Sequence, residues 1–283
     1  MKPDFWAWRR RRVGIRMFEF DRDENLLAEL LKTKMIGVGD FGSEMVNYSI
    51  ANSILNVEFA VVGTKNETLL KSSAPQRLKV SDSIDEETRK NLAELVKSLD
   101  LLFIFTDLAD ENISTQIAEL AETDLKVAIL PSANLDKEKL EKFQGVADSL
   151  IILEKKNVEL MLSAVRCINS LVSEPGVVGL DFADVKSVLE KSGRGYVGYG
   201  RATGEQPIIE AMNSAINSLK DTLHNSKRLL VCFFGWYENL QRIEANEATI
   251  LQEAAHPDAE IMWGVVLDIT NQDFVEVIVI SAE

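Results

Sequence analysis

Hydrophobic and polar positions follow two alternating patterns along the first half of the chain. Short, almost wholly apolar runs alternate with amphipathic segments such as "DEETRKNLAELVKSL" and "NISTQIAELAE". The apolar runs are "TKMIGVG", "VEFAVVGT", "DLLFIFTDL", "LKVAILP" and "DSLIILEKK". Continuous apolar runs are typical of strands buried on both faces, and the segments between them are typical of helices that cover such a sheet. The pattern predicts a parallel sheet of nucleotide-binding type that ends near residue 155.

The second half of the chain has a different pattern. Residues 157–173, "NVELMLSAVRCINSLVS", predict one long helix, which the following Pro-Gly pair ends. Beyond it, helices are predicted in "VKSVLEKSG", "EQPIIEAMNSAINSL" and "NEATILQEAA", and strands in "GYVGYGRAT", "KRLLVCFFGW", "AEIMWGVVLD" and "FVEVIVIS". The last two strands, joined by "DITNQD", are predicted to be neighbours, which favours a mixed or antiparallel sheet.

These patterns predict an α/β protein with four parts. A parallel-sheet, Rossmann-like nucleotide-type domain and a long central helix are followed by a smaller α+β domain with a mixed sheet. The predicted parts are an N-terminal basic and aromatic extension (1–32), the nucleotide-type domain (33–156), the central helix (157–174) and the C-terminal domain (175–283).

Charge is distributed unevenly and limits the choice of partner. The net charge is −14, but residues 1–16 carry six basic residues and one acid, so their charge is +5 and the remaining chain carries −19. An acidic body repels nucleic acid, so we expect no nucleic-acid partner. In residues 1–18, the tryptophans and the Arg9–Arg12 run resemble a membrane-surface anchor. A solvated tail, or a tail folded onto the acidic body, is the alternative for this segment.

The small numbers of cysteines and histidines and the lack of long apolar runs disfavour several other classes of protein. The two cysteines lie in apolar runs, which predicts buried thiols. With two histidines in the chain, a histidine-rich metal site is disfavoured, and we expect no metal. Apolar runs stay below the roughly 18 residues that span a bilayer. We therefore expect a cytoplasmic protein.

A glycine motif follows the first predicted strand. In "GVGDFG", Gly37, Gly39 and Gly42 match G-x-G-x-x-G and open a helix, as a phosphate-binding loop does. However, the second strand ends "VVGTKN" without the acid that holds a dinucleotide ribose, and Asp40 lies inside the loop. A second match, "GRGYVG", follows a helix and enters a strand, which is the wrong context for a phosphate loop.

Two aspartates begin a helix in the second half of the chain. In "PGVVGLDFADVKSVLEKSG", Asp181 and Asp184 are one helical turn apart. A close carboxylate pair can serve acid/base chemistry or a metal. It can equally be structural, since Asp181 can cap a helix that starts at Phe182 and an acid three residues later favours the helix dipole.

The order of these elements resembles the tubulin/FtsZ superfamily, in particular FtsZ, over about residues 34–283. The loop "GLDFADV" is similar to the N-x-D-F-A-D-V synergy loop, with glycine in place of its asparagine. The segment "GYGRATGE" is similar to the G-x-G-x-A-x-G-E pattern that follows it, and "ANEATILQEAAHPDAEIMWGVVLD" with "FVEVIVIS" resembles the last helix and strands. The resemblance implies that Asp181 and Asp184 reach across a head-to-tail contact and position water at the γ-phosphate of a neighbouring subunit.

The chain departs from the family where the family binds GTP. The glycine-rich signature after the fourth strand, close to G-G-G-T-G-T-G, is replaced by "TDLADENIST", which has no glycine and brings in Asp107, Asp110 and Glu111. Backbone that approaches phosphate closely needs glycine, and like charges repel the ligand. The glycine- and alanine-rich loop after "LKV" is missing, the first loop is weakened, and the guanine-reading start of the central helix is reduced.

These features leave three functions open. The first is a non-hydrolysing FtsZ-like paralogue that binds or regulates tubulin-type filaments through its synergy-loop face, with FtsZ-family subunits head to tail, or itself, as partner. The second is a diverged GTPase with a rebuilt pocket, for which GTP would be the cofactor. The third is a scaffold that keeps only the fold. We expect no GTPase activity from the chain alone, although it could complete the site of a neighbour.

Overall fold

The computed structural model describes residues 31–81, 83–133, 136–153, 157–174, 176–236, 240, 245–267 and 274–282. These residues divide into two compact units. We call the first the parallel-sheet unit; its described residues lie within 31–166, 186–197 and 281–282. The second, the mixed-sheet unit, comprises described residues within 167–185 and 198–280. Residues 1–30 of the N-terminal extension, which include the predicted membrane-surface segment 1–18, lie outside the described residues.

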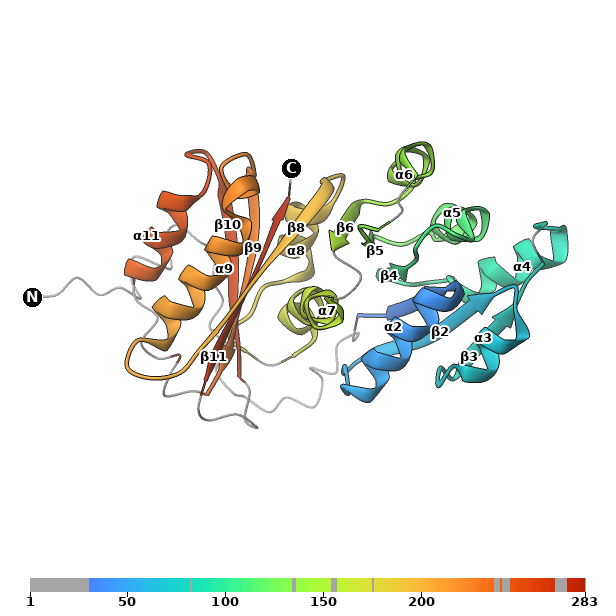
Figure 1. The fold of residues 1–283 in the computed structure, drawn as a ribbon, viewed down its shortest axis with the longest axis horizontal. Coiled ribbons are helices and arrows are strands. Elements are labelled where there is room, and N and C mark those ends of the chain that lie inside the picture. The colour runs from blue at the N-terminus through green and yellow to red at the C-terminus, as the bar shows by residue number, and fades with distance from the viewer. Residues whose placement is uncertain are drawn as a thin grey trace, which may run out of the picture. The chain divides into compact units, whose positions relative to one another are not determined.

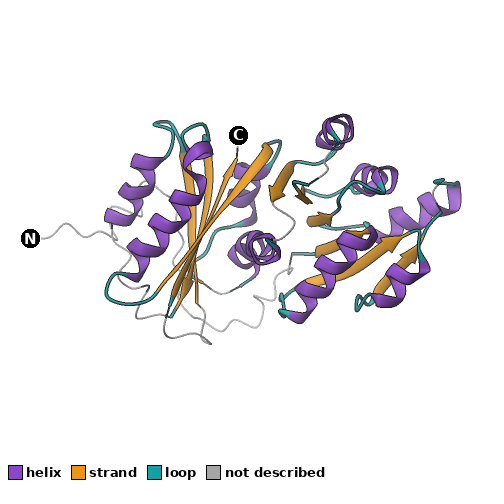
Figure 2. Ribbon diagram, in the orientation of Figure 1, coloured by secondary structure: helices purple, strands orange, loops and turns teal. Residues whose placement is uncertain are grey.

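Parallel strands alternating with helices form the parallel-sheet unit (Figures 1 and 2). Its strands are β1 (Thr33–Val38), β2 (Val57–Gly63), β3 (Gln76–Lys79), β4 (Leu101–Phe105), β5 (Leu125–Pro131) and β6 (Ser149–Leu153). Its helices are α2 (Gly39–Ala51), α3 (Asn66–Lys71), α4 (Glu86–Leu95), α5 (Glu111–Leu120) and α6 (Lys137–Gln144). The strand order is β3-β2-β1-β4-β5-β6, and every pairing between them is parallel.

The core of this unit explains why the strands read as continuous apolar runs. One face of the sheet, with side chains such as Ile36, Val62 and Ile104, is buried against apolar residues of α4, α5 and α6. The opposite face of β1 and β2 is covered by α2. Successive residues of a strand point to opposite faces of the sheet. Because both faces are covered, both sets of residues are mainly apolar. The parallel nucleotide-type sheet predicted from the sequence is confirmed.

The later elements build the mixed-sheet unit and the links to it. They are α7 (Val158–Ser173), β7 (Gly176–Val178), α8 (Phe182–Leu189), β8 (Gly193–Ala202), α9 (Pro207–Leu223), β9 (Arg228–Gly235), α11 (Ala245–Ala254), β10 (Glu260–Leu267) and β11 (Val275–Ala282). The strand order is β8-β11-β9-β10-β7, with β9 and β10 parallel and β10 and β7 antiparallel. The mixed sheet is therefore confirmed.

The predicted pairing of the last two strands is wrong. Strand β9 lies between β10 and β11, so the strands flanking "DITNQD" are not neighbours. Closeness in sequence suggested a hairpin, but β10 instead pairs in parallel with β9, which precedes it by a helical crossover. The connecting residues 268–273 are outside the described part of the chain.

Glycines allow α9 to pack directly on β8. A Cβ atom at Gly200 would lie far inside contact distance of the backbone carbonyl oxygen of Ala211, and one at Gly198 would meet that of Ala215 in the same way. The "GRGYVG" segment lies wholly in this strand, as its sequence context predicts for a motif that is no phosphate loop. Gly198 and Gly200 are thus explained by helix-on-strand packing.

Replacement of Gly200 by alanine should destabilise the mixed-sheet unit, because the new methyl group would push α9 away from β8. We expect Gly200→Ala to lower the free energy of unfolding by about 1–3 kcal/mol. Gly179→Ala is the matched control: a Cβ there meets nothing within 4 Å, so the change should stay within about 0.5 kcal/mol. Urea denaturation followed by circular dichroism measures both, and equal midpoints for the two variants would contradict the packing argument.

Candidate functional site: a filled phosphate face

The turn between β1 and α2 contains the three glycines of the predicted phosphate loop. Gly39 has φ +70°, in the left-handed region that favours glycine. Gly37 and Gly42 touch each other, and a Cβ at Gly42 would lie 2.5 Å from the carbonyl oxygen of Phe105 at the end of β4. The backbones of β1, α2 and β4 therefore meet without side chains between them. This packing by itself requires Gly37 and Gly42, and the backbone conformation favours glycine at position 39, whether or not a ligand binds.

A carboxylate lies against the middle glycine. Oδ2 of Asp110, at the start of α5, is 2.9 Å from the position that a Cβ of Gly39 would occupy. In G-x-G-x-x-G loops, the second glycine is the one that lets the backbone approach a pyrophosphate. The position that a side chain of Gly39 would occupy thus faces a negative charge from the same chain.

The connection between β4 and α5 is held by hydrogen bonds between its own backbone and side chains. The backbone N–H of Leu108 donates to Oγ1 of Thr106 at 3.0 Å, and that of Ala109 donates to Oδ1 of Asp107 at 3.0 Å. Leu108 has φ +59° and is buried, so an apolar side chain occupies a backbone position that favours glycine. Lys139 donates to the Leu108 carbonyl oxygen at 3.3 Å. The amide groups of Leu108 and Ala109 are thus bonded within the loop.

Two other acids near the β1–α2 turn, Asp40 and Glu111, are paired with lysines. Nζ of Lys65 lies 2.9 Å from Oδ2 of Asp40, and the Thr68 hydroxyl also donates to Asp40. The Thr68 hydrogen bond, followed by that from Lys65, holds the pKa of Asp40 below its usual value. Glu111 pairs with Lys142 at 2.8 Å. Of the three acids that the sequence places in "TDLADENIST", it is Asp110 that lies against the glycine turn.

Asp181 and Asp184 form a reciprocal cap at the start of α8. The backbone N–H of Asp184 donates to Oδ1 of Asp181 at 2.8 Å, and the N–H of Asp181 donates to Oδ2 of Asp184 at 3.1 Å. This arrangement is a capping box, in which each side chain satisfies one of the helix's unpaired N–H groups. Burial raises the pKa of Asp184 above its usual value, and the neighbouring Asp181 charge acts in the same direction. The capping role, one of the alternatives that the sequence left open, is what this geometry shows.

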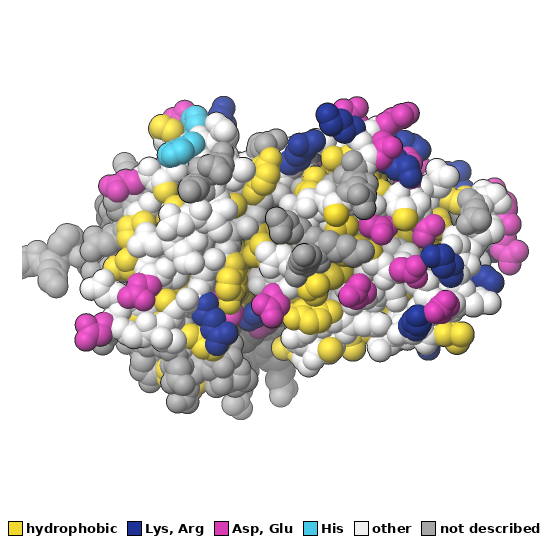
Figure 3. Space-filling model, viewed as in Figure 1, with side chains coloured by type: hydrophobic (Ala, Val, Ile, Leu, Met, Phe, Trp, Pro, Cys, Tyr) yellow, Lys and Arg dark blue, Asp and Glu magenta, His cyan; other side chains and the backbone are white. Residues whose placement is uncertain are grey.

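Charged side chains of both signs are mixed on the surface (Figure 3), and the described residues contain neither a metal-type cluster nor a membrane-spanning helix. On the face drawn in Figure 3, acidic and basic side chains are interspersed over the described residues. Nowhere in the described residues do three or more His, Cys, Asp or Glu side chains gather in a way that could hold a metal ion. Within the same residues, every helix is too short or too polar to cross a bilayer.

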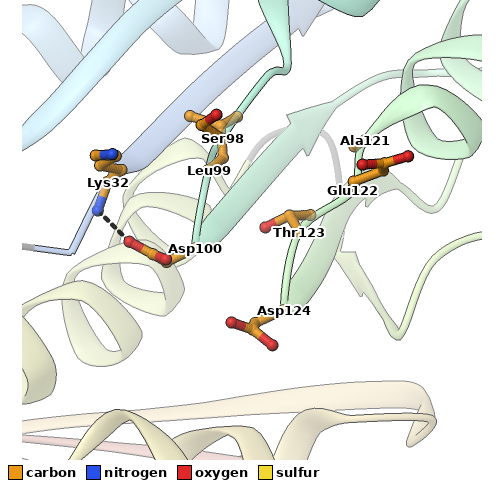
Figure 4. A pocket seen from close by; sticks show the side chains of 8 residues that line it. All are labelled: Lys32, Ser98, Leu99, Asp100, Ala121, Glu122, Thr123 and Asp124. Atoms are coloured by element: carbon orange, nitrogen blue, oxygen red, sulfur yellow. Dashed lines mark hydrogen bonds between the residues drawn. The ribbon is translucent and has the colours of Figure 1, made fainter.

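A hollow of about 500 Å³ lies at the amino-terminal ends of β1, β4 and β5 (Figure 4). Its lining includes Lys32, Asp100, Glu122 and Asp124, and the Lys32 backbone N–H donates to Oδ2 of Asp100 at 2.8 Å. Ligands of open parallel sheets bind at the carboxyl ends of the strands, which is the edge that bears the glycine turn. This hollow is therefore separate from the candidate phosphate face. No sequence pattern indicated this hollow, because its lining residues are scattered over three strand starts.

Comparisons with known proteins give the class of fold. No family model matches the chain. Among solved structures, a point mutant of FtsZ from M. jannaschii has a TM-score of 0.76 and 19% identity, covering 92% of this chain and 93% of its own. An empty FtsZ dimer from M. jannaschii has a TM-score of 0.76 and 21% identity, over 92% and 90% of the two chains. CetZ from Methanosaeta thermophila gives 0.70 and 18%, over 89% and 87%.

The chain therefore has the fold of the tubulin/FtsZ superfamily, as the order of its motifs predicts. At identities this low, the likeness establishes the architecture alone. The roles of Asp181 and Asp184 toward a neighbour, and of Gly37, Gly39 and Gly42 toward a phosphate, stay predictions. What the sequence did not show is the Asp110 contact with Gly39, since 71 residues separate them and only the β1–β4 pairing brings their turns together.

The capping role of Asp181 can be measured on the isolated protein. Asp181→Ala should lower the free energy of unfolding by about 1 kcal/mol, because the Asp184 N–H loses its acceptor. Asp181→Ser should lose far less, since a serine hydroxyl can accept the same hydrogen bond. Urea denaturation gives the stabilities, and hydrogen exchange of the Asp184 amide reports the bond directly. If the alanine and serine variants exchange at the same rate, the cap does not form in solution.

Proposed function

We propose that this protein is a non-hydrolysing member of the FtsZ-fold group that regulates tubulin-type filaments without using GTP itself. The observation that carries the proposal is the filled phosphate face. The β4–α5 connection bonds its own amide groups, and Asp110 lies at the glycine turn.

Energetics support the loss of nucleotide binding. A phosphate oxygen about 4 Å from the Asp110 carboxylate would meet a repulsion on the order of 4 kcal/mol at an effective dielectric of about 20, and less where solvent screens it. To present the Leu108 and Ala109 amides, the loop would also have to break two internal hydrogen bonds, each worth about 1 kcal/mol. Together these terms are a large part of the roughly 8 kcal/mol that micromolar binding represents.

The second half of the proposal concerns the loop that bears Asp181 and Asp184. FtsZ is known in a dimeric form, and the resemblance implies head-to-tail contacts in which this loop faces the neighbour's nucleotide. Such a contact is heterologous, so each subunit presents two different surfaces. Here the loop keeps both acids while the nucleotide face is filled. The protein would then add to a GTP-loaded FtsZ-type subunit and offer no loaded face for the next one.

A diverged GTPase remains the second candidate, and one observation favours it. A hollow of about 460 Å³ lies beside the carboxyl ends of β2 and β3, lined by residues that include Thr64, Lys79, Ser81 and Asp85. This is the edge of a parallel sheet where ligands bind. A nucleotide shifted toward β3 would avoid Asp110. The experiment on GTP binding decides between the two candidates.

The wild-type protein should bind neither GTP nor GDP at micromolar concentrations and should hydrolyse no GTP alone. Isothermal titration calorimetry with magnesium present, together with a phosphate-release assay, measures both. An active FtsZ in the same buffer is the positive control. A dissociation constant in the low micromolar range would replace the proposal by the diverged GTPase.

Substoichiometric amounts of the protein should shorten the filaments of an active FtsZ and alter its GTPase rate. Asp181→Ser is the informative variant, because it keeps an acceptor for the helix cap but removes the carboxylate. We expect it to shorten filaments nearly as well as wild type but to lose any stimulation of the partner's hydrolysis. Sedimentation, electron microscopy of filament length and phosphate release are the readouts. Unchanged filament mass, length and rate with the wild-type protein would leave only the scaffold function.

A further inference from the structure

Asp110 is the N-cap residue of α5, but its side chain does not cap that helix. An aspartate at the N-cap normally accepts a hydrogen bond from the second or third N–H of its helix. The Asp110 side chain makes no such cap bond; its backbone carbonyl oxygen accepts from the N–H groups of Ile113 and Ser114, both at 3.1 Å. Its carboxylate lies instead against Gly39, the first residue of another helix.

The place where this carboxylate lies is suited to an anion. The N-terminus of a helix carries partial positive charge and exposed N–H groups, and α2 is 13 residues long. Gly39 has no side chain on the side that Asp110 faces. Lys65 adds positive charge: its pKa is raised mainly by the Asp40 hydrogen bond, and the Asp110 charge contributes in the same direction.

The other acid at this turn does not fill the same space. Asp40, in the first turn of α2, directs its carboxylate to Lys65 and to the Thr68 hydroxyl on α3. Asp110, which follows the neighbouring strand β4, is therefore the residue that lies against Gly39. Its carboxylate resembles a phosphate in its negative charge and its oxygen atoms.

We propose that Asp110 is an internal substitute for phosphate, which holds the β1–α2 turn in place and excludes a free phosphate group from Gly39. This inference rests on the proposed function, because it explains how the face dispenses with nucleotide. It adds a regulatory consequence: the turn takes the same form whatever the GTP concentration, so filament binding by this protein is independent of its own nucleotide state. It also states that removal of one side chain uncovers an anion site.

The test is a titration of inorganic phosphate into wild type and three variants, at constant ionic strength to exclude screening effects. Asp110→Ala removes both charge and bulk, and Asp110→Asn removes the charge alone. Asp107→Asn is the matched control, because it makes the same charge change in the same loop and keeps an acceptor for the Ala109 N–H. The amide signals of Gly37 and Gly39 in ¹H–¹⁵N NMR spectra report binding at the turn itself.

We expect phosphate to shift the Gly39 signal saturably in Asp110→Ala, with a half-saturation concentration at least about tenfold below that of wild type, equivalent to about 1.4 kcal/mol. Asp110→Asn should lie between the two, and Asp107→Asn should match wild type. Hydrogen exchange at residues 39–42 should be faster in Asp110→Ala without phosphate and slow again when phosphate is added.

The inference is overturned if both Asp110 variants bind phosphate no better than Asp107→Asn, or if binding in Asp110→Ala leaves the glycine signals unmoved. Thermal melting by circular dichroism shows whether each variant is folded, and Asp110→Asn carries the test if the alanine variant is not. The outcome is separate from that of the proposed function. GTP binding by wild type would contradict the proposed function, whereas the Asp110 inference depends on a difference between variants.

Discussion

The close approach of three backbones at the β1–α2 turn is the constraint on which the parallel-sheet unit depends. The Gly37–Gly42 contact and the nearness of Gly42 to the Phe105 carbonyl oxygen fix where α2 begins and how closely β4 lies beside it. Any side chain at these points would separate the helix from the sheet. The glycines that suggest a nucleotide site are thus first of all a requirement of the fold, and this requirement holds whether or not a ligand binds.

That constraint also explains the chemistry of the adjacent face. Because β1 and β4 are neighbours, the turns that follow them open at the same edge of the sheet. Two loops that open side by side can together surround a phosphate. In the present chain the second loop, held by its own Thr106 and Asp107 side chains, brings a carboxylate to the first. The edge of the sheet at which such loops meet thus carries a carboxylate of the chain itself.

The sequence predicted the architecture well because the fold is determined by features that are local or repetitive. Continuous apolar runs identified the parallel strands, and the order of motifs gave the superfamily fold. The pairing of β10 with β9 could not be predicted in the same way, since an apolar strand shows the same pattern beside any neighbour. Likewise, the acids of "TDLADENIST" were recognisable as charges, but only three-dimensional packing distinguishes Asp110 at Gly39 from Glu111 bound to Lys142. For Asp181 and Asp184, the capping geometry could be anticipated from spacing, whereas a role toward another subunit is not contained in one chain.

Leu108 has a consequence for which changes the β4–α5 connection can tolerate. Its side chain is part of the hydrophobic core of the parallel-sheet unit, although its backbone adopts the left-handed conformation that glycine favours. Leu108→Gly would relax the backbone but would leave a cavity where the side chain had been, and such losses destabilise proteins by about 2–5 kcal/mol. The loop is thereby coupled to the core. A glycine-rich loop at this position would require compensating changes in the core as well, so single substitutions could not introduce it without a loss of stability.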